Sequence, residues 1–595
     1  MGPSGSGKTS LLKVLNGQMK TKLSEESKFY LSKYCPIRVC YLTQEISGHL
    51  MPGLTALQSL IYASKLKNAS EVSNVDHESI ARNILNELNI ADTADTYVQK
   101  CSGGERKRLA LGLELTSLRM PNLICIDEPT SGLDSNSAEV VIECLHRVAH
   151  SHNLTIITSV HQPNIQILMM FDQLYVLAKG GVCVYSGRPM DIRQFLTRIP
   201  GQTINENIFP VEQLIRYSCL NHTDKVVQTL VRFKEAEITK QTEMELERDT
   251  QQVIDGIPTI RNRFSLWSCW MLLLRYFAFI RGHQWIPYIV FTAIIIFQGP
   301  SLVNMIDKKI IYTSGCINWE ESYNNTCNQT QQEKDADEDL KWHLRFILAA
   351  NCFLLSLIFL QCSITFANDL RYFWNEHRNG WYSSGAFYSS RMVIEWIPLF
   401  IAIIGFSYTI NIYESIRPGL FYWFIIIFTI AAIPMQCMGY LLAILTSKNF
   451  NMMIIIITVL TLIHYMLSGS NTPIDDLHYT YQFISNFIPT RFVNSITLLL
   501  QFGFDRCRYK EIQSILYYFS ITDDHFNHSI IMLIANGLFY QLLALIALII
   551  KANPFKSRRQ RAKKILDHHQ TMKRSNVIIP GIGCHHEFTI KQFRI

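Results

Sequence analysis

Six long apolar runs in the second half of the chain constrain its fold more than any other feature. Each run is close to the ~20 residues that a helix needs to cross the hydrocarbon core of a bilayer. Within that core the backbone polar groups must be satisfied internally, which a bundle of helices achieves. The predicted spans are Trp285–Ile306, Leu344–Phe366, Met392–Ile410, Phe421–Leu445, Met452–Leu467 and Ile530–Lys551.

The composition changes near residue 265, because the preceding part mixes charged and apolar residues as a soluble domain does. A chain of 595 residues is long enough for two or more domains. We therefore expect a soluble domain joined to an all-α membrane domain. The expected boundaries are 1–230 for the soluble domain, 231–264 for a charged linker, 265–284 for a connecting helix in the membrane interface, 285–551 for the six-span domain and 552–595 for a basic cytoplasmic tail.

Six spans return the chain to the side of the membrane on which it starts, and the basic cluster Lys556–Lys564 marks that side as cytoplasmic. Basic residues beside apolar runs favour a membrane surface over nucleic acid as the partner. The membrane is either the plasma membrane or that of an intracellular vesicle. Glycosylation sequons in the predicted outer loops agree with this topology, at Asn324, Asn328 and Asn527. In the same loops Cys316 and Cys327 are candidates for a local disulfide, and Cys507 is either a free thiol or an intermolecular bridge.

The first residues of the chain match the phosphate-binding pattern G-x-x-x-x-G-K-[ST] without a mismatch. Glycines in such a loop allow successive backbone N–H groups to point at phosphates. The apolar run 10–15 predicts a helix whose N-terminus faces them. Lys8 is expected to reach the β- and γ-phosphates, and Thr9 to hold Mg²⁺. The predicted contacts are Gly2, Pro3, Ser4, Gly5, Ser6, Gly7, Lys8, Thr9 and Ser10.

A buried strand and a glycine-rich helix start extend this site. The apolar run 123–126 ends in Asp127 and Glu128, so a strand there delivers two carboxylates to its C-terminal edge. Asp127 is placed to hold Mg²⁺ and Glu128 to polarise an attacking water. Residues 101–108, Cys-Ser-Gly-Gly-Glu-Arg-Lys-Arg, lead into a helical run.

With these motifs the first 190 residues resemble the nucleotide-binding domain of an ATP-binding-cassette (ABC) transporter, an α/β P-loop fold. The resemblance identifies Ser102, Gly103, Gly104 and Glu105 as a signature motif, Asp134 as part of the D-loop, Gln44 as the Q-loop glutamine and His161 as the switch histidine. It implies ATP and Mg²⁺ as cofactors, with Thr9, Gln44 and Asp127 at the metal. It also implies that two such domains pack head to tail, so a chain with one motif set is a half-transporter that pairs with itself or with another half-transporter.

The order of the domains resembles the G, or White, subfamily, as do residues 101–108 and the segment Asn375–Tyr382. Glu395 resembles the acidic residue of that subfamily's third span, and we expect it to pair with Arg378 or Arg391 because a carboxylate at membrane depth is costly alone. The segment Ser468–Pro473 departs from the subfamily's glycine- and phenylalanine-rich pattern. Spans two and five line the subfamily's central cavity, which implicates Asn351, Gln361, Thr458, Thr461 and His464 as substrate contacts; such polar groups also serve as contacts between helices.

The function expected from this resemblance is ATP-driven transport of an amphipathic or lipid-like small molecule by a dimer. Two alternatives remain: a shortened, ATPase-defective chain that binds partners without transporting, and an importer or pigment-precursor carrier of the same architecture. In the family a buried strand leads into the phosphate loop, and here only Met1 precedes Gly2. We therefore expect an incomplete N-terminus, weaker nucleotide binding and a less stable domain than in a version extended upstream.

Overall fold

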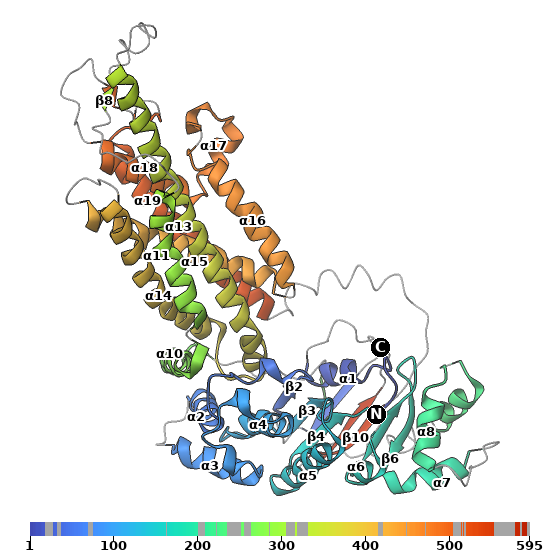
Figure 1. The fold of residues 1–595 in the computed structure, drawn as a ribbon. Helices are drawn as coiled ribbons and strands as arrows, with labels where there is room; N and C mark the ends of the chain where they lie inside the picture. Colours follow the sequence, from blue (N-terminus) through green and yellow to red (C-terminus); the bar gives the residue numbers. More distant parts are fainter. Residues whose placement is uncertain are drawn as a thin grey trace. The chain divides into compact units, whose positions relative to one another are not determined.

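The computed structural model divides into two compact units (Figure 1). The first comprises Met1–Gly282, Arg371–Phe387 and Ala552–Ile595, and the second comprises His283–Leu370 and Tyr388–Lys551. The structure describes residues 1–17, 28–32, 37–69, 75–161, 163–199, 209–221, 223–234, 251–254, 263–284, 286–304, 316–317, 331–413, 420–447, 449–470, 472–503, 513–514, 516, 519–552, 577–582 and 586–591. The predicted sites Asn324, Asn328, Cys327 and Cys507, most of the charged linker and the basic cluster 556–564 lie outside these residues.

A parallel sheet forms the centre of the first unit, in the order β2 (Val39–Leu42), β3 (Leu123–Asp127) and β4 (Thr155–Ser159). Every residue of β3 is buried, as expected for a strand covered on both faces. Helix α1 (Lys8–Leu15) buries its leucines and Val14 in a core shared with this sheet. The predicted α/β P-loop fold is therefore confirmed.

Side-chain caps fix where the helices around this sheet begin. Thr55 and Ser102 each close a capping box, at α2 (Ala56–Lys67) and α4 (Gly103–Leu115). Single acidic caps, Asp76 and Asp134, open α3 (His77–Glu87) and α5 (Ser135–Ser151). Short 3₁₀ turns connect these elements, at Ile46–Gly48, Ala91–Thr93 and Val98–Lys100.

A second core in the same unit gathers the elements after β4. They are α6 (Ile165–Met169), β5 (Leu174–Leu177), β6 (Cys183–Gly187), the turn Pro189–Asp191, α7 (Ile192–Thr197), α8 (Pro210–Ser218) and the helical residues 225–234. Val227 and Leu230 are fully buried in this core, and Val231 and Phe233 pack against it, so the core continues past the predicted boundary at 230. A separate antiparallel sheet has the order β10 (Val577–Ile582), β11 (His586–Lys591), β1 (Lys28–Ser32) and β7 (Gln251–Ile254).

Helix α10 (Leu266–Phe279) lies at the expected position of the connecting helix and continues into a π turn at Ile280–Gln284. Trp267 and Trp270 are exposed on one side, whereas Leu272 and Tyr276 are buried on the other. Exposed tryptophans are typical of the membrane interface, and the location of this helix in that interface stays a prediction.

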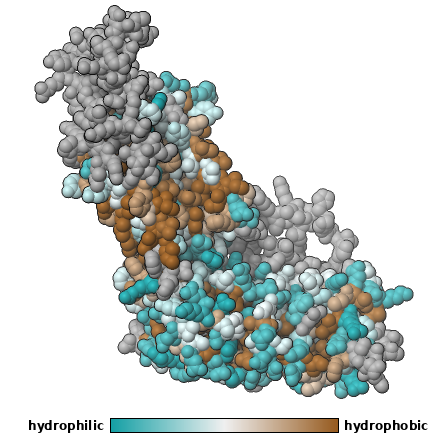
Figure 2. Space-filling view, viewed as in Figure 1, coloured by the Kyte–Doolittle hydropathy of each residue, from teal (hydrophilic) through white to brown (hydrophobic). Residues whose placement is uncertain are grey.

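The second unit is helical. Its long elements are α11 (Ile286–Asn304), α13 (Gln331–Arg378), α14 (Ser384–Tyr413), α15 (Phe421–Leu445), α16 (Phe450–Met466) and α19 (His525–Ala552). Figure 2 shows apolar surface gathered over the helices, as expected of lipid-facing positions. Among the described residues, four stretches are long and apolar enough to cross a membrane: Trp342–Arg378, Ser384–Asn411, Phe421–Leu445 and His525–Ala552.

The other two predicted spans differ from a simple crossing. Helix α11 follows the segment Leu266–Gly282 after a short break, and the pair counts as a fifth span if taken as one. Helix α16 has 17 residues, or about 26 Å, which is slightly short of the ~30 Å hydrocarbon core. Where six spans were predicted, the described residues therefore hold four helices of sufficient length and hydropathy, or five with the bent pair, and α16 as a shorter apolar helix.

Two helices were not predicted, α17 (Tyr479–Ser485) and α18 (Pro489–Phe502). Pro489 opens α18, and all but two of its residues are buried. Its 14 residues carry buried Asn494, Thr497 and Gln501, which breaks the apolar pattern by which spans are recognised. A short pair, β8 (Cys316–Ile317) and β9 (Gln513–Ser514), joins distant loops, and only the backbone of Cys316 is described.

Candidate nucleotide-binding site

The glycine-rich loop folds tightly over the start of α1. Gly7 adopts a left-handed φ of 87° immediately before the helix, a conformation that favours glycine. At Gly2 a Cβ atom would lie 2.3 Å from the carbonyl oxygen of Leu177 in β5, so no side chain fits there. The Lys8 Nζ donates to the carbonyl oxygens of Gly2 and Pro3 at 2.8 and 2.9 Å. Burial lowers the pKa of Lys8, although the nearby Glu128 and Asp127 oppose this shift.

Asp127 is the centre of a hydrogen-bonded cluster at the end of β3. Its Oδ1 accepts hydrogen bonds from Thr9 Oγ1 at 3.1 Å and from Ser159 Oγ at 2.5 Å. Its Oδ2 accepts one from the Tyr41 hydroxyl at 3.3 Å. The sequence motifs therefore bring Thr9 and Asp127 into direct contact. A hydroxyl and a carboxylate supply the oxygen ligands that Mg²⁺ prefers, so this pair fits the predicted metal site.

Glu128 is held in a strained conformation. Its φ is 49°, in the left-handed region that costs a residue other than glycine roughly 1–2 kcal/mol. Its N–H donates to both the carbonyl oxygen and Oγ of Ser159, at 3.2 and 2.9 Å, and these bonds hold the turn. The Gln44 Nε2 donates to Glu128 Oε2 at 2.7 Å. Gln44 and Glu128 are thus adjacent, as the motifs predict.

The signature and D-loop residues lie at the surface of this unit. Ser102 is exposed. In its capping box the Ser102 N–H donates to the Glu105 carboxylate, and the Glu105 N–H donates to the Ser102 hydroxyl. Asp134 is also exposed and caps α5, and this hydrogen bonding lowers its pKa. His161 is exposed two residues after β4, whose last residue Ser159 pairs with Asp127. Contact of Ser102, Asp134 and His161 with a nucleotide remains a prediction.

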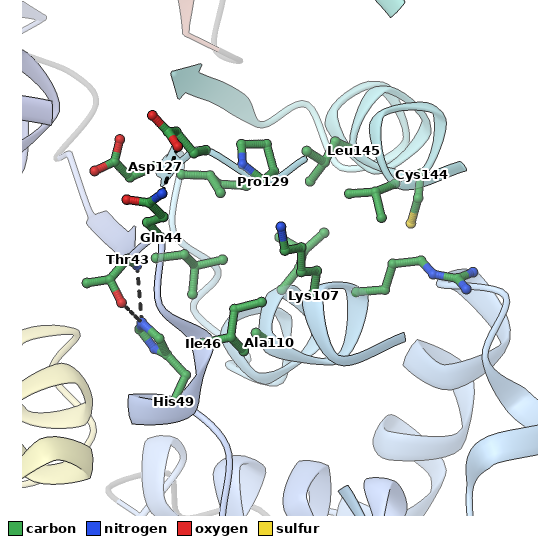
Figure 3. A pocket seen from close by; sticks show the side chains of 16 residues that line it. Thr43, Gln44, Ile46, His49, Lys107, Ala110, Asp127, Pro129, Cys144 and Leu145 are labelled. Carbon is green, nitrogen blue, oxygen red and sulfur yellow. Dashed lines mark hydrogen bonds between the residues drawn. The ribbon is translucent and has the colours of Figure 1, made fainter. Parts of the chain in front are cut away.

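A pocket lies next to the acidic pair, between α4, α5 and the end of β3 (Figure 3). Lys107 points into it, and its Nζ donates to the carbonyl oxygen of Ser131 at 2.5 Å. Burial lowers the pKa of Lys107 to about 8, against the opposing charge of Glu128. Lys107 therefore interacts electrostatically with Glu128, which the sequence pattern did not indicate.

His49 was also missed, and it fixes the loop that carries Gln44. Its Nε2 lies 3.2 Å from the N–H of Thr43 and 3.0 Å from the Thr43 hydroxyl (Figure 3). That hydroxyl donates in turn to the carbonyl oxygen of Glu45 at 2.8 Å. Burial lowers the pKa of His49 to about 4, although the charge of Glu114 opposes this shift. The neutral ring can then accept the hydrogen bond from the Thr43 N–H through Nε2.

The segment Arg371–Phe387 belongs to the first unit and contacts the central strand β2. Asn379 pairs with the backbone of Tyr41 through both its amide oxygen and its amide nitrogen, at 3.1 and 3.2 Å. Its amide nitrogen also donates to Glu114 Oε1 at 2.8 Å. The Lys67 Nζ lies 2.6 Å from Glu114 Oε2, which completes a buried cluster. The segment 375–382, noted as a subfamily resemblance, is therefore built into the nucleotide-binding unit.

A second buried ion pair joins the same segment to α10. The Arg275 guanidinium makes two parallel bonds to the Glu376 carboxylate at 2.7 and 2.8 Å, a geometry that adds strength and direction. The Tyr382 hydroxyl donates to the same carboxylate. The connecting helix and the segment 371–387 are thus fixed to each other.

In the second unit a buried network surrounds Arg391. Its guanidinium lies 2.6 Å from Glu395 Oε1 and 3.0 Å from Asp369 Oδ2. The Tyr440 hydroxyl donates to Glu395 Oε2 at 2.6 Å, and Thr365 donates to Oε1. Of the two partners expected for Glu395, the structure selects Arg391.

The predicted substrate residues fall into two groups. Asn351 is buried and donates to Asn494 and Thr497 of α18, and His464 is buried and stacked on Phe359 at 6.3 Å. Gln361 is also buried. Thr458 is exposed and Thr461 half-buried on α16. Asn351 therefore serves a contact between helices, and cavity lining stays a prediction for the set.

Comparisons with known proteins agree with this architecture. Residues 1–131 match the ABC transporter family and residues 301–502 match the ABC-2 type transporter family. The chain is 33% identical to ABC transporter G family member STR2 of Medicago truncatula over 36% of this chain and 30% of the relative. It is 35% identical to G family member 22 of Arabidopsis thaliana over 33% of this chain and 27% of the relative.

G family member 13 of Arabidopsis thaliana is 31% identical over 45% of this chain and 40% of the relative. The chain thus spans well under half of the length of each of these curated relatives. The matched domains occur in the order expected from the sequence, and the ABC-2 match places the apolar helices in a multi-pass membrane protein. The chain thus combines a match to the ABC transporter family with one to the ABC-2 type transporter family, and together with its G-family relatives these matches support a G-subfamily half-transporter.

Proposed function

We propose that two copies of this chain, or one copy and another half-transporter, use ATP hydrolysis to move an amphipathic or lipid-like small molecule across a membrane. The observation that carries the proposal is the cluster at the end of β3. Thr9 contacts Asp127 and Gln44 contacts Glu128, so four predicted metal-binding and catalytic residues meet in one unit. The same polypeptide continues into an ABC-2 type membrane domain.

Each residue of the cluster has a defined chemical task. The Lys8 ammonium binds the β- and γ-phosphates after leaving the carbonyl oxygens of Gly2 and Pro3. Thr9 and Asp127 hold Mg²⁺, which when bound neutralises phosphate charge. The Glu128 carboxylate orients and polarises the attacking water. When nucleotide binds, Gln44 releases its hydrogen bond to Glu128 and contacts the nucleotide instead.

Dimerisation is supported by the exposure of the signature and D-loop residues. Ser102 and Asp134 begin α4 and α5 at the surface, where they are accessible to a second chain. The N-terminal amides of α4, a helix of 13 residues, favour an anion such as the γ-phosphate of a partner's nucleotide. Because each motif is intact, a homodimer would contain two competent sites.

Tyr41 offers a short route from the nucleotide to the rest of the transporter. Its hydroxyl donates to Asp127, and its backbone pairs with Asn379 of the segment 371–387. A change in the charge around Asp127 therefore reaches this segment through one residue. The segment continues directly into the membrane helices α13 and α14.

ATP hydrolysis by the purified full chain in detergent or nanodiscs tests the enzymatic part. We expect phosphate release that depends on Mg²⁺ and is abolished in Glu128→Gln, while that variant still binds ATP. Gln keeps the size of the side chain and removes the carboxylate. ATP binding by the variant would therefore show that it is folded and that only the chemical step is lost. Hydrolysis equal in the two proteins would refute the proposal.

Transport is tested in inside-out vesicles that contain wild-type protein or Glu128→Gln. Candidate sterols, phospholipids and tryptophan- or guanine-like compounds are compared for ATP-dependent accumulation. Accumulation of a lipid-like compound only with wild-type protein supports the proposed substrate class. Accumulation restricted to the tryptophan- or guanine-like compounds would contradict it.

A further inference from the structure

Two histidines and an aspartate on the surface of the first unit form a cluster that the nucleotide chemistry does not use. His146 and His150 stand one turn apart on α5, and Asp172 lies between α6 and β5. One ligand atom from each of the three residues lies within 4.8 Å of the others. We propose that this triad, His146, His150 and Asp172, binds a divalent transition-metal ion, with Zn²⁺ as its principal occupant.

The spacing on the helix suits a shared metal. Residues four apart on a helix lie on the same face, and two histidines at this spacing form the metal-binding pair of the zinc motif H-E-x-x-H. The two rings are already close, with centroids 4.4 Å apart and planes inclined by 50°. Their nitrogens can therefore converge on one ion by rotation of the side chains.

The aspartate supplies a third ligand from a different element. The His150 Nε2 lies 3.7 Å from Asp172 Oδ1. Tetrahedral coordination with bonds of 2.0–2.2 Å places neighbouring ligand atoms about 3.4 Å apart, so little movement is needed. Imidazole and carboxylate together suit Zn²⁺ better than Mg²⁺ or Ca²⁺, which prefer oxygen ligands alone.

The triad leaves a coordination position open to solvent. The side chains of His150 and Asp172 are 59% and 72% exposed, so an ion reaches them without opening the fold. Three protein ligands and one water complete a four-coordinate site. The nearby Arg147 donates to the carbonyl oxygen of Glu87 on α3, so its guanidinium is engaged away from the triad.

Binding would tie together two elements that follow catalytic motifs. Helix α5 begins directly after Asp134, and Asp172 follows α6, which lies a few residues after His161. An ion held by His146, His150 and Asp172 restrains the C-terminal half of α5 against the α6–β5 loop. Zn²⁺ should therefore slow amide hydrogen exchange in both segments.

The test uses the full chain purified without a polyhistidine tag, stripped with a chelator and titrated with ZnCl₂ against a fluorescent zinc indicator. We expect His150→Ala to lose one Zn²⁺ equivalent or to bind that equivalent at least about tenfold more weakly. Even substitution of residues that only hydrogen-bond a metal ligand costs about 10–100-fold in metal affinity. Asp172→Asn should weaken the same equivalent. His152→Ala is the matched control, because His152 lies two residues from His150 but pairs with Glu87 at 2.7 Å.

Two further readouts separate a defined site from a general surface effect. Co²⁺ should give the visible absorption of a four-coordinate ion in wild-type protein and in His152→Ala, and not in His150→Ala. Hydrogen exchange around residues 146–150 and 170–174 should slow with Zn²⁺ only where the triad is intact. Equal Zn²⁺ stoichiometry and affinity in wild-type protein and His150→Ala would overturn the proposal, whether or not the chain hydrolyses ATP.

Discussion

Replacing Lys67 with methionine should destabilise the nucleotide-binding unit strongly. Lys67 pairs with Glu114 at 2.6 Å, and the two side chains are only 6% and 4% exposed. Removing one partner of a buried pair costs roughly 3–5 kcal/mol, because the other charge is left buried. Glu114 keeps hydrogen bonds from Asn379 and Trp381, so we place the loss at the lower end, about 3 kcal/mol.

Thermal unfolding of the detergent-solubilised chain measures this loss through tryptophan fluorescence. Trp381 is a local reporter, since the Lys67 Nζ lies 4.7 Å from the centre of its ring. At roughly 2–4 °C per kcal/mol for a unit of this size, the expected fall in Tm is about 6–12 °C. Adding Glu114→Gln removes the orphaned charge and should recover most of the fall.

The control is Arg82→Met, which breaks an exposed pair with Glu78 on α3. Exposed pairs of this kind contribute about 0.3–0.5 kcal/mol, so its Tm should change by no more than about 2 °C. If Lys67→Met behaves like Arg82→Met, or if Glu114→Gln fails to restore stability, the cluster is not held together by its charges.

Three further predictions concern His49, Gly2 and Arg391. Because burial lowers the pKa of His49 to about 4 from an ordinary 6.5, its contribution is complete above pH 6.5. About 3 kcal/mol should be lost as the pH falls from 6.5 to 4, and a Tm profile of His49→Gln lacking this loss would confirm the source. Alanine is strained by the positive φ at both Gly2 and Gly5, but only at Gly2 would its Cβ also meet the backbone of Leu177, so Gly2→Ala should weaken binding of a fluorescent ATP analogue more than Gly5→Ala; similar affinities would contradict this. Arg391→Lys should reduce the monodisperse yield in detergent because an ammonium cannot span Asp369 and Glu395 as the guanidinium does, and an unchanged yield would argue against it.

The catalytic cluster could be predicted from sequence because each of its members lies in a local motif. The fixed spacing within residues 2–9 and the strand ending at Asp127 are enough to place Thr9 and Asp127 together once the strands are parallel. The apolar helices were equally accessible, since length and hydropathy are properties of a continuous run. Domain order then followed from the position of the two patterns along the chain.

Residues that act through distant contacts could not be found in this way. His49, Glu114 and Lys67 carry no motif, and their importance arises only when α2, α4 and the segment around Asn379 pack together. The choice between Arg378 and Arg391 as the partner of Glu395 was also a question of helix packing. Helix α18 was not predicted because its buried side chains include polar ones, which pair with α13. A membrane segment is recognised from sequence by a continuous apolar run, and these polar residues interrupt it.

At Glu128 the left-handed backbone favours glycine for stability, whereas the proposed chemistry needs a carboxylate. Glycine would adopt the same φ without strain and would stabilise the turn, yet it would remove the carboxylate. A search for stabilised variants that scores folding alone would therefore favour an inactive protein at position 128. Any such engineering of this chain needs a functional screen to retain the glutamate.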